Sequence, residues 1–304
     1  MTRVSDTASH ALMLSGLNRS LDRTRDVQVQ ISTGKVGLEY ADIGRQAQRL
    51  VSLEGERTRA DLYMQNNRTV DLRLQKMESV IAQVTEIASE AKTLFVSAGN
   101  ANNVAEVDME GRMQGMLQSI AGLLNSELNG RSLFSGARTD TPPVDLNLLP
   151  ADGEFLTTAD AFYYQGDDQV QRHRASDSLS IDYGVKANDP GFEKLIRGLK
   201  IAETVDTSDP EAARLRIDRA LGLINEAMQR LPDVRGRVGG SLAVLEKETT
   251  RLEDFTLALD ESVSDIENVD LAEAISRLSE EQAQMQAALA AMARLRQVTL
   301  TSFL

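Results

Sequence analysis

The chain has 304 residues, with 46 acidic against 33 basic side chains and a formal net charge of -13. Such an acidic chain repels polyphosphates, and no local basic stripe opposes that field, which argues against a nucleic-acid partner. Cysteine and tryptophan are absent and aromatic residues make up only 4%, so disulfides and cysteine-ligated metals are excluded and an all-β sandwich is disfavoured.

The first predicted element is an amphipathic helix that ends near residue 31. Its stripe fades toward the end and consists of Leu14, Leu17, Leu21, Thr24, Gln28 and Ile31, at three-and-four spacing. The first thirty residues contain no continuous apolar core, so no secretory signal peptide is expected. No run of about 18 apolar residues occurs anywhere, so no membrane insertion is expected either.

A glycine-rich stretch follows, with Gly34, Gly37 and Gly44 in QISTGKVGLEYADIGRQAQRL. Gly34-Lys35 resembles the end of a phosphate-binding loop, but the spacing G-x-x-x-x-G-K-[ST] is absent and Val36 follows the lysine. Glycines also let a chain change direction between helices. We therefore interpret the stretch as a hinge, and expect no nucleotide and no other cofactor.

Two further helices are predicted next. The first carries a sustained heptad seam: Val70, Leu74, Met77, Ile81, Val84, Ala88, Ala91 and Phe95. The stretch SAGNANN, residues 97–103, is expected to end it. The following helix places Met109, Met113, Met116, Ile120 and Leu123 on one face, which we interpret as core packing.

The middle of the chain, residues 139–189, is interpreted as a small β-rich module. FYYQGDDQVQRHR places Gly166, Asp167 and Asp168 at a turn between two predicted strands. SLSIDYGV alternates apolar and polar residues and is predicted to be another strand.

Helix returns after Asp189-Pro190-Gly191 and again at Pro210, with Asp209 as the predicted N-cap. Gly239-Gly240 is expected to break the helical pattern. A second seam then contains Leu242, Leu245, Thr249, Leu252, Thr256, Leu259, Val263 and Ile266, and after ENVD a third contains Leu271, Ile275, Leu278, Gln282, Met285, Leu289 and Met292.

These elements predict a mainly α fold: a long antiparallel helical bundle or coiled coil built from the N- and C-terminal segments, with a small β-rich inserted domain. We expect three domains: 1–36 with 270–304 as a terminal helical domain, 37–138 with 190–269 as a helical core, and 139–189 as the β-rich domain.

Few residues are candidates for chemistry. His10 and His173 lie far apart, and His173 is interpreted as an exposed strand residue whose arginine neighbours disfavour its protonation. Asp167-Asp168 offers too few oxygens for a hard cation. We therefore predict no catalytic residue, no metal site and no enzymatic activity.

Several motifs occur in order along the chain: QVQISTGK (28–35), YADIG (40–44), NGRSLFSGARTDTPPV (129–144), YYQGDD (163–168), VRGRVGGSLAVLE (234–246) and the closing TLTSFL. In this succession the chain resembles the flagellin superfamily. LEYADIGRQAQ stands where filament flagellins carry an SAADDAAG-like stretch. The chain also ends in Ser302-Phe303-Leu304, whereas filament flagellins tend to end in a Leu-rich segment with a terminal Arg. Both departures favour the hook-associated members at the hook–filament junction.

The resemblance implies an extracellular axial component of the bacterial flagellum, exported by the flagellar type III apparatus, that joins hook to filament. Implied partners are identical subunits, the adjoining hook-associated protein, flagellin and an export chaperone. A filament flagellin is the nearest alternative, and a cytosolic coiled-coil scaffold is a more distant one.

Two residue sets follow from the seams. The residues expected to pack between subunits are Leu14, Leu17, Leu21, Ile31, Leu271, Ile275, Leu278, Met285, Leu289 and Met292. The residues expected to form the core seam are Val70, Leu74, Met77, Ile81, Val84, Leu242, Leu245, Leu252, Leu259 and Ile266.

Overall fold

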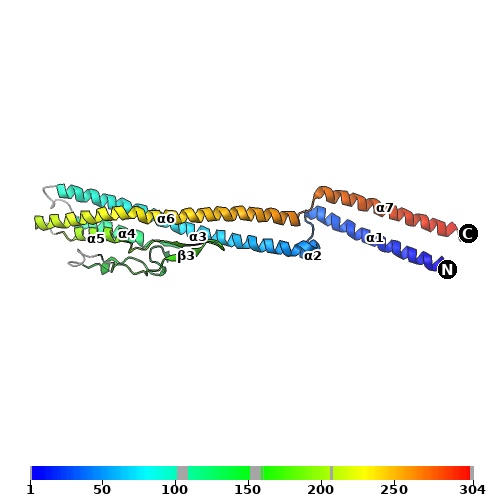
Figure 1. Ribbon diagram of the computed structural model, residues 1–304, viewed down its shortest axis with the longest axis horizontal. Helices are drawn as coiled ribbons and strands as arrows, with labels where there is room; N and C mark the ends of the chain where they lie inside the picture. Colours follow the sequence, from blue (N-terminus) through cyan, green and yellow to red (C-terminus); the bar gives the residue numbers. More distant parts are fainter. Residues whose placement is uncertain (1, 101–108, 151–158, 160, 206–207, 302–304) are drawn as a thin grey trace. The chain divides into compact units, whose positions relative to one another are not determined.

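The computed structural model describes residues 2–100, 109–150, 159, 161–205 and 208–301. Helices dominate these residues, and the strands form only small antiparallel sheets (Figure 1). The prediction of a mainly α fold with a small β region is therefore confirmed. The chain divides into two compact units: unit 1 comprises residues 1–59 and 255–304, and unit 2 comprises residues 60–254.

Unit 1 is built around two antiparallel helices, α1 (Thr2–Thr33) and α7 (Leu271–Thr301), which lie side by side (Figure 1). Ser20 contacts Glu281, and Lys35 is bridged to Asn268, so residue numbers rise along one helix as they fall along the other. Unit 1 also contains α2 (Tyr40–Ile43), the 3-10 turn η1 (Gly44–Gln46) and the adjoining ends of α3 (Ala47–Asn100) and α6 (Pro210–Glu267).

Unit 2 takes the remainder of α3 and α6, which also run antiparallel. Asn67 Nδ2 lies 3.4 Å from Thr249 Oγ1, and Arg235 Nε lies 2.9 Å from Glu78 Oε1. Helices α4 (Met109–Leu124) and α5 (Pro190–Glu203) pack on each other. Their apolar faces join those of α3 and α6 in the main hydrophobic core.

The predicted helix starts and stops are largely confirmed. Asp209 Oδ1 accepts hydrogen bonds from the backbone N–H groups of Glu211 and Ala212, both at 3.1 Å, so it caps α6. Asp189 caps α5 in the same way through Gly191. Helix α3 is described as far as Asn100, and residues 101–103 of the predicted stop signal lie outside the described residues, so this stop remains a prediction.

The predicted break at Gly239-Gly240 is wrong, because α6 continues through both glycines to Glu267. Val234 and Val238, on the inner face of the same segment, are each 1% exposed. Burial of this face outweighs the helix-propensity cost of about 1 kcal/mol per glycine.

The β-strands among the described residues form two short hairpins. β1 (Glu127–Leu128) and β2 (Arg131–Ser132) flank Asn129 and Gly130, whose φ angles of 54° and 70° match a two-residue hairpin turn. β3 (Gln171–Arg174) pairs with β4 (Ser180–Tyr183). A further 3-10 turn, η3, spans Leu146–Leu148.

The strand expected before Gly166 is not formed by the described residues there, where Tyr164 makes a single bridge to Val144. Gly166 instead packs tightly, since a Cβ added to it would lie 2.5 Å from Ser135 O. The segment before Gly166 therefore lies against residues 129–144 and is not paired as a strand.

Candidate functional site

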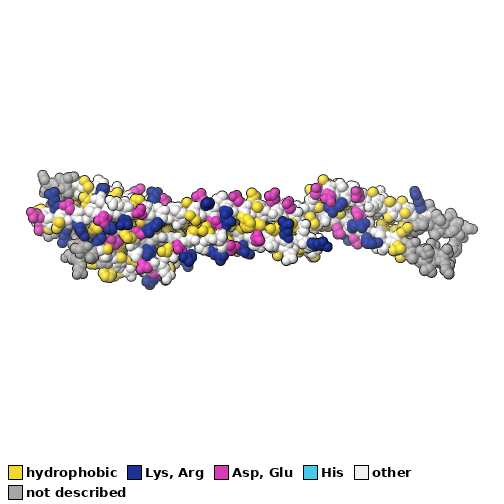
Figure 2. Space-filling view, in the orientation of Figure 1, with side chains coloured by type: hydrophobic (Ala, Val, Ile, Leu, Met, Phe, Trp, Pro, Cys, Tyr) yellow, Lys and Arg dark blue, Asp and Glu magenta, His cyan; other side chains and the backbone are white. Residues whose placement is uncertain are grey.

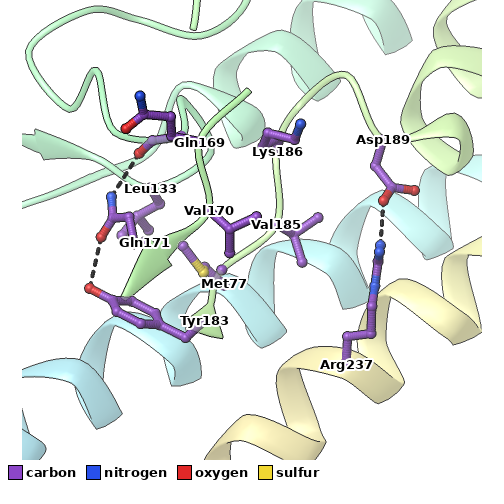
Figure 3. Close-up of a pocket in the computed structure, with 12 residues that line it drawn as sticks. Met77, Leu133, Gln169, Val170, Gln171, Tyr183, Val185, Lys186, Asp189 and Arg237 are labelled. Atoms are coloured by element: carbon purple, nitrogen blue, oxygen red, sulfur yellow. Dashed lines mark hydrogen bonds and ion pairs between the residues drawn. The ribbon is translucent and has the colours of Figure 1, made fainter. Parts of the chain in front are cut away.

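The pocket between the β3–β4 hairpin and the helices of unit 2 is small, with a volume of about 70 Å³ (Figure 3). Its polar side chains bind each other: Tyr183 donates a 2.7 Å hydrogen bond to Gln171 Oε1, and Arg237 is paired with Asp189. Lys186 Nζ lies 2.8 Å from Asp168 Oδ1. These groups satisfy one another: the first contact lies within the hairpin, the second joins α6 to the start of α5, and the third joins the two loops that flank the hairpin.

The residues considered for chemistry have structural roles. Asp167 Oδ1 accepts hydrogen bonds from the backbone N–H groups of Ala137 and Gln169, whereas Asp168 bonds Lys186. Among the residues that the structure describes, no three His, Asp or Glu side chains are grouped so as to hold a metal ion. The side chain of His10 lies outside the described part of the structure.

His173 lies on a strand as predicted, but its predicted exposure is wrong. Its Nε2 lies 2.7 Å from Asn67 Oδ1, and its ring meets that of Tyr183 edge-on at 6.4 Å. Burial lowers the pKa of His173, rather than the neighbouring arginines invoked from the sequence. The side chain is thus part of the joint between the hairpin and α3.

The glycine-rich stretch forms the connection from α1 to α3, which passes through α2 and η1. Gly34 and Gly44 have φ angles of 72° and 63°, where a side chain is disfavoured. Val36 N–H donates to Glu267 O at 2.7 Å and Val269 N–H donates to Gly34 O at 2.9 Å. The loop after α1 is therefore tied by backbone hydrogen bonds to the loop before α7, and we call this contact the clasp.

Helices α1 and α7 each have an inner face turned toward the other helix. On α1 the buried and partly buried positions include Met13, Leu17, Ser20, Thr24, Val27 and Ile31, and on α7 they are, among the described side chains, Ala274, Leu278, Glu281, Met285, Ala288 and Met292. Both sets follow steps of four and three, which is the spacing of a coiled-coil seam.

The predicted packing residues divide between this seam and the outside of the pair. Leu17, Ile31, Leu278, Met285 and Met292 lie on the inner faces and are partly buried. The others are exposed, by 42% for Leu14, 46% for Leu21, 49% for Leu271, 54% for Ile275 and 49% for Leu289. We call these five residues the outer apolar residues. Their role in packing between subunits stays a prediction.

The outer apolar residues are the feature of unit 1 most suited to binding another protein. Figure 2 shows hydrophobic side chains at the surface among the charged ones in this part of the chain. Large apolar side chains that recur on one helix face and gain no cover within their own unit are typical of protein–protein contacts. A coiled-coil partner would cover them with heptad-spaced apolar residues of its own.

The predicted core-seam residues are inside. Val70, Leu74, Met77, Ile81, Val84 and Leu245 lie in the main core, and Leu242 packs against it. Leu252 lies in a smaller cluster with Ala60 and Met64. Leu259 and Ile266, in unit 1, are buried as well.

Sequence reasoning missed the polar residues within the seams. Asn67 is completely buried, and its Nδ2 donates to Ala175 O at 3.1 Å. Ser20 Oγ donates to Glu281 Oε2 at 2.8 Å. The position of Asn67 in the sequence could have revealed its role. It lies three residues before Val70 on the same heptad face, and a polar residue at a seam position needs a specific hydrogen-bond partner.

No described helix is long and apolar enough to cross a membrane. The family described as the bacterial flagellin N-terminal helical region matches residues 4–139, and the bacterial flagellin C-terminal helical region matches residues 221–304.

Two relatives match nearly the whole chain. "Flagellar hook-associated protein 3" of Escherichia coli K12 is 23% identical over 302 residues, covering 94% of both chains. The protein of the same name from Salmonella typhimurium LT2 is 24% identical, also with 94% coverage of both.

Two solved structures share the fold. A flagellar hook-associated protein from Vibrio parahaemolyticus has a TM-score of 0.61 at 19% identity, with 75% of this chain and 100% of that chain covered. FlgL from Bacillus cereus has a TM-score of 0.54 at 15% identity, with 70% of this chain and 98% of that chain covered. At these identities the likeness concerns the fold alone.

Proposed function

The chain belongs to the bacterial flagellin family, and from this premise we propose that it is a structural component of the flagellum that joins the hook to the filament. Matches at both terminal helical regions support the family, and relatives that carry the hook-associated name over 94% of the chain support the junction role. The flagellin family consists of structural proteins, and we propose that this chain has no enzymatic activity.

The observation that carries the proposal is the pairing of the two chain ends in unit 1. Helices α1 and α7 bury one seam between them and leave Leu14, Leu21, Leu271, Ile275 and Leu289 exposed. A monomer gains nothing from such residues, whereas a ring or tube of subunits buries them against neighbours. The outer apolar residues are therefore proposed to be covered by other copies of the chain.

The partners and route follow from the same proposal. One side of a junction contacts the adjoining hook-associated protein and the other contacts flagellin. The family resemblance adds export through the flagellar type III apparatus, with an export chaperone. Neither a signal peptide nor a cysteine framework is needed for that route.

The division into three domains is retained as part of the proposal. Residues 1–36 with 270–304 would form the inner domain, 37–138 with 190–269 the core and 139–189 the outer β-rich domain. Its first boundary coincides with the clasp, where Gly34, Val36, Glu267 and Val269 share backbone hydrogen bonds.

The alternatives are not favoured. A filament flagellin would match the same family regions, but the relatives covering 94% of the chain are hook-associated proteins. A cytosolic coiled-coil scaffold has no support from these matches.

Immunogold electron microscopy of isolated flagella tests the proposed location. An antibody against the chain is expected to label a narrow band at the distal end of the hook. Label along the whole filament would make the chain a filament subunit, and label found only in cell bodies would contradict a flagellar role. A strain lacking the gene supplies the background.

A further inference from the structure

In the part of the α1–α7 pair that the structure describes, the polar side-chain contacts between the two helices converge on Glu281. Ser20 Oγ donates to Glu281 Oε2 at 2.8 Å, and Arg23 Nε lies 2.7 Å from Glu281 Oε1. The Glu281 side chain is only 16% exposed. Both of its oxygens are therefore used by α1.

The surroundings of this contact are apolar or internally satisfied. Val27 is 8% exposed and Ala274 is fully buried. Thr24 Oγ1 donates to Ser20 O of its own helix, so it makes no demand on α7. The hydrogen bonds from Ser20 and then Arg23 lower the pKa of Glu281, so its carboxylate is charged at neutral pH.

We propose that Ser20, Arg23 and Glu281 determine the register in which α1 packs on α7. The heptad pattern alone does not, because a seam repeated every seven residues looks similar after a slip of one heptad. A single polar position within an apolar seam is the best-attested device for choosing one register.

The alternative registers show how the selection works. The two helices are antiparallel, so a slip of one heptad would move Glu281 from Ser20 to Met13 or Val27. Neither side chain can donate a hydrogen bond. The shift along the helix axis is about 10 Å. A slip to Met13 takes Glu281 out of the reach of Arg23, and a slip to Val27 places Glu281 on the C-terminal side of Arg23, opposite to the N-terminal direction in which helical side chains lean. A slipped pair would thus press an unpaired carboxylate against apolar side chains, at a cost that the native register avoids.

The clasp at the other end of the pair does not provide this selectivity by itself. It joins the loops beyond the helix ends through backbone hydrogen bonds of Gly34, Val36, Glu267 and Val269 and through one ion pair, in which Lys35 Nζ lies 3.1 Å from Glu267 Oε2. The lysine side chain of that pair is 48% exposed, and an exposed ion pair contributes little stability. The register inference depends only on the fold of unit 1. Its consequence, that the outer apolar residues of α1 and α7 are aligned for a neighbouring subunit, rests on the proposed function.

The chain contains no cysteine, so engineered cysteine pairs in the full-length protein report the register directly. Val27→Cys with Ala274→Cys should be adjacent in the native register. Leu17→Cys with Leu278→Cys and Thr24→Cys with Met285→Cys should be adjacent only after a slip of one heptad in either direction. Each pair is oxidised in dilute monomeric protein, and the intramolecular disulfide is quantified.

With Glu281 in place, the slipped pairs are expected to cross-link roughly tenfold less than the native pair, or lower still. Glu281→Leu should keep the helical content and raise at least one slipped pair to near the native yield. Glu281→Gln, which can still accept from Ser20, is the matched control and should favour the native pair. The double variant Arg23→Glu with Glu281→Arg, which exchanges the two charges, should also favour the native pair.

Two results would overturn the proposal. If Glu281→Leu cross-links only the native pair, the clasp and loops are sufficient to fix the register. If all cross-links and the helicity of the pair are lost, the contact is required for pairing itself and does not choose among registers. Either result, measured on monomers, leaves the flagellar location to be judged separately by immunogold labelling.

Discussion

At the scale of single residues, polar and apolar side chains in the seams have different structural roles. Leu252 joins α6 to α3 by packing on Ala60 and Met64. Substitution by another apolar side chain of similar size should cost little stability. Asn67 joins the same helices to the hairpin through His173, Ala175 and Thr249, each by a directed hydrogen bond. Loss of either the apolar packing or the hydrogen bonds should destabilise unit 2, but only the hydrogen bonds require a fixed donor–acceptor geometry.

Leu252→Asp should destabilise unit 2 by roughly 3–5 kcal/mol, because it removes a buried side chain and places a charge against an apolar cluster. Leu257→Asp is the matched control on the same helix, where the side chain is 70% exposed, and should change stability by less than about 0.5 kcal/mol. Urea denaturation followed by circular dichroism measures both. Equal midpoints for the two variants would show that Leu252 is not a packing residue.

The half-buried position of His173 predicts a pH dependence of stability. Burial lowers the pKa of His173 in the folded chain, so its stabilising contribution is complete above the unfolded-state pKa of about 6.5 and is lost as the pH falls from there toward the folded-state pKa. Stability should decline more between pH 7.5 and pH 5.5 in the native protein than in His173→Gln, which does not titrate. Parallel pH profiles of the two proteins would contradict this.

At the scale of elements, the sequence predicted what depends on periodicity and chain chemistry. The heptad seams located α3, α6 and α7, and Asp209 was predicted as the N-cap of α6 because a carboxylate just before Pro can accept hydrogen bonds from free backbone N–H groups. Helix continuation through Gly239 was missed, because it depends on burial of Val234 and Val238 by distant segments. The partners of Asn67 and Glu281 were also missed, since contacts between remote segments leave no periodic signal.

Gly239→Ala and Gly240→Ala should each stabilise the protein by about 0.5–1 kcal/mol, because α6 is helical there and an added Cβ would meet no atom within 4 Å. Gly130→Ala is the control. It also has open space, but its φ is +70°, so alanine should cost about 1–2 kcal/mol. Thermal unfolding separates the two cases. Destabilisation by all three variants would argue that α6 is broken in solution.

At the scale of the whole molecule, the chain ends and the middle have separable roles. The main core lies within unit 2, whereas α1 and α7 pair within unit 1. Unit 2 can therefore keep its core without the terminal helices. The predicted role of the ends in joining subunits gives a reason for outer apolar residues that stability alone does not require.

Deletion of residues 271–304 should abolish junction assembly and leave unit 2 folded, because it removes α7 and none of the main core. Limited proteolysis and circular dichroism of the purified truncation follow the fold, and electron microscopy of a strain producing it follows assembly. Near-normal junctions in that strain would count against a role for α7. A melted unit 2 would show that the ends are needed for the fold itself.

The most direct test of the architectural account combines Leu14→Ser with Leu21→Ser, on the exposed face of α1. Asn18→Ser with Gln28→Ser, also exposed on α1, is the matched control. Both double variants should unfold at the same midpoint as the native protein, and only the leucine variant should fail to form hook–filament junctions when flagella are viewed by electron microscopy. Normal junctions with the leucine variant would contradict the claim that these faces bind sister subunits.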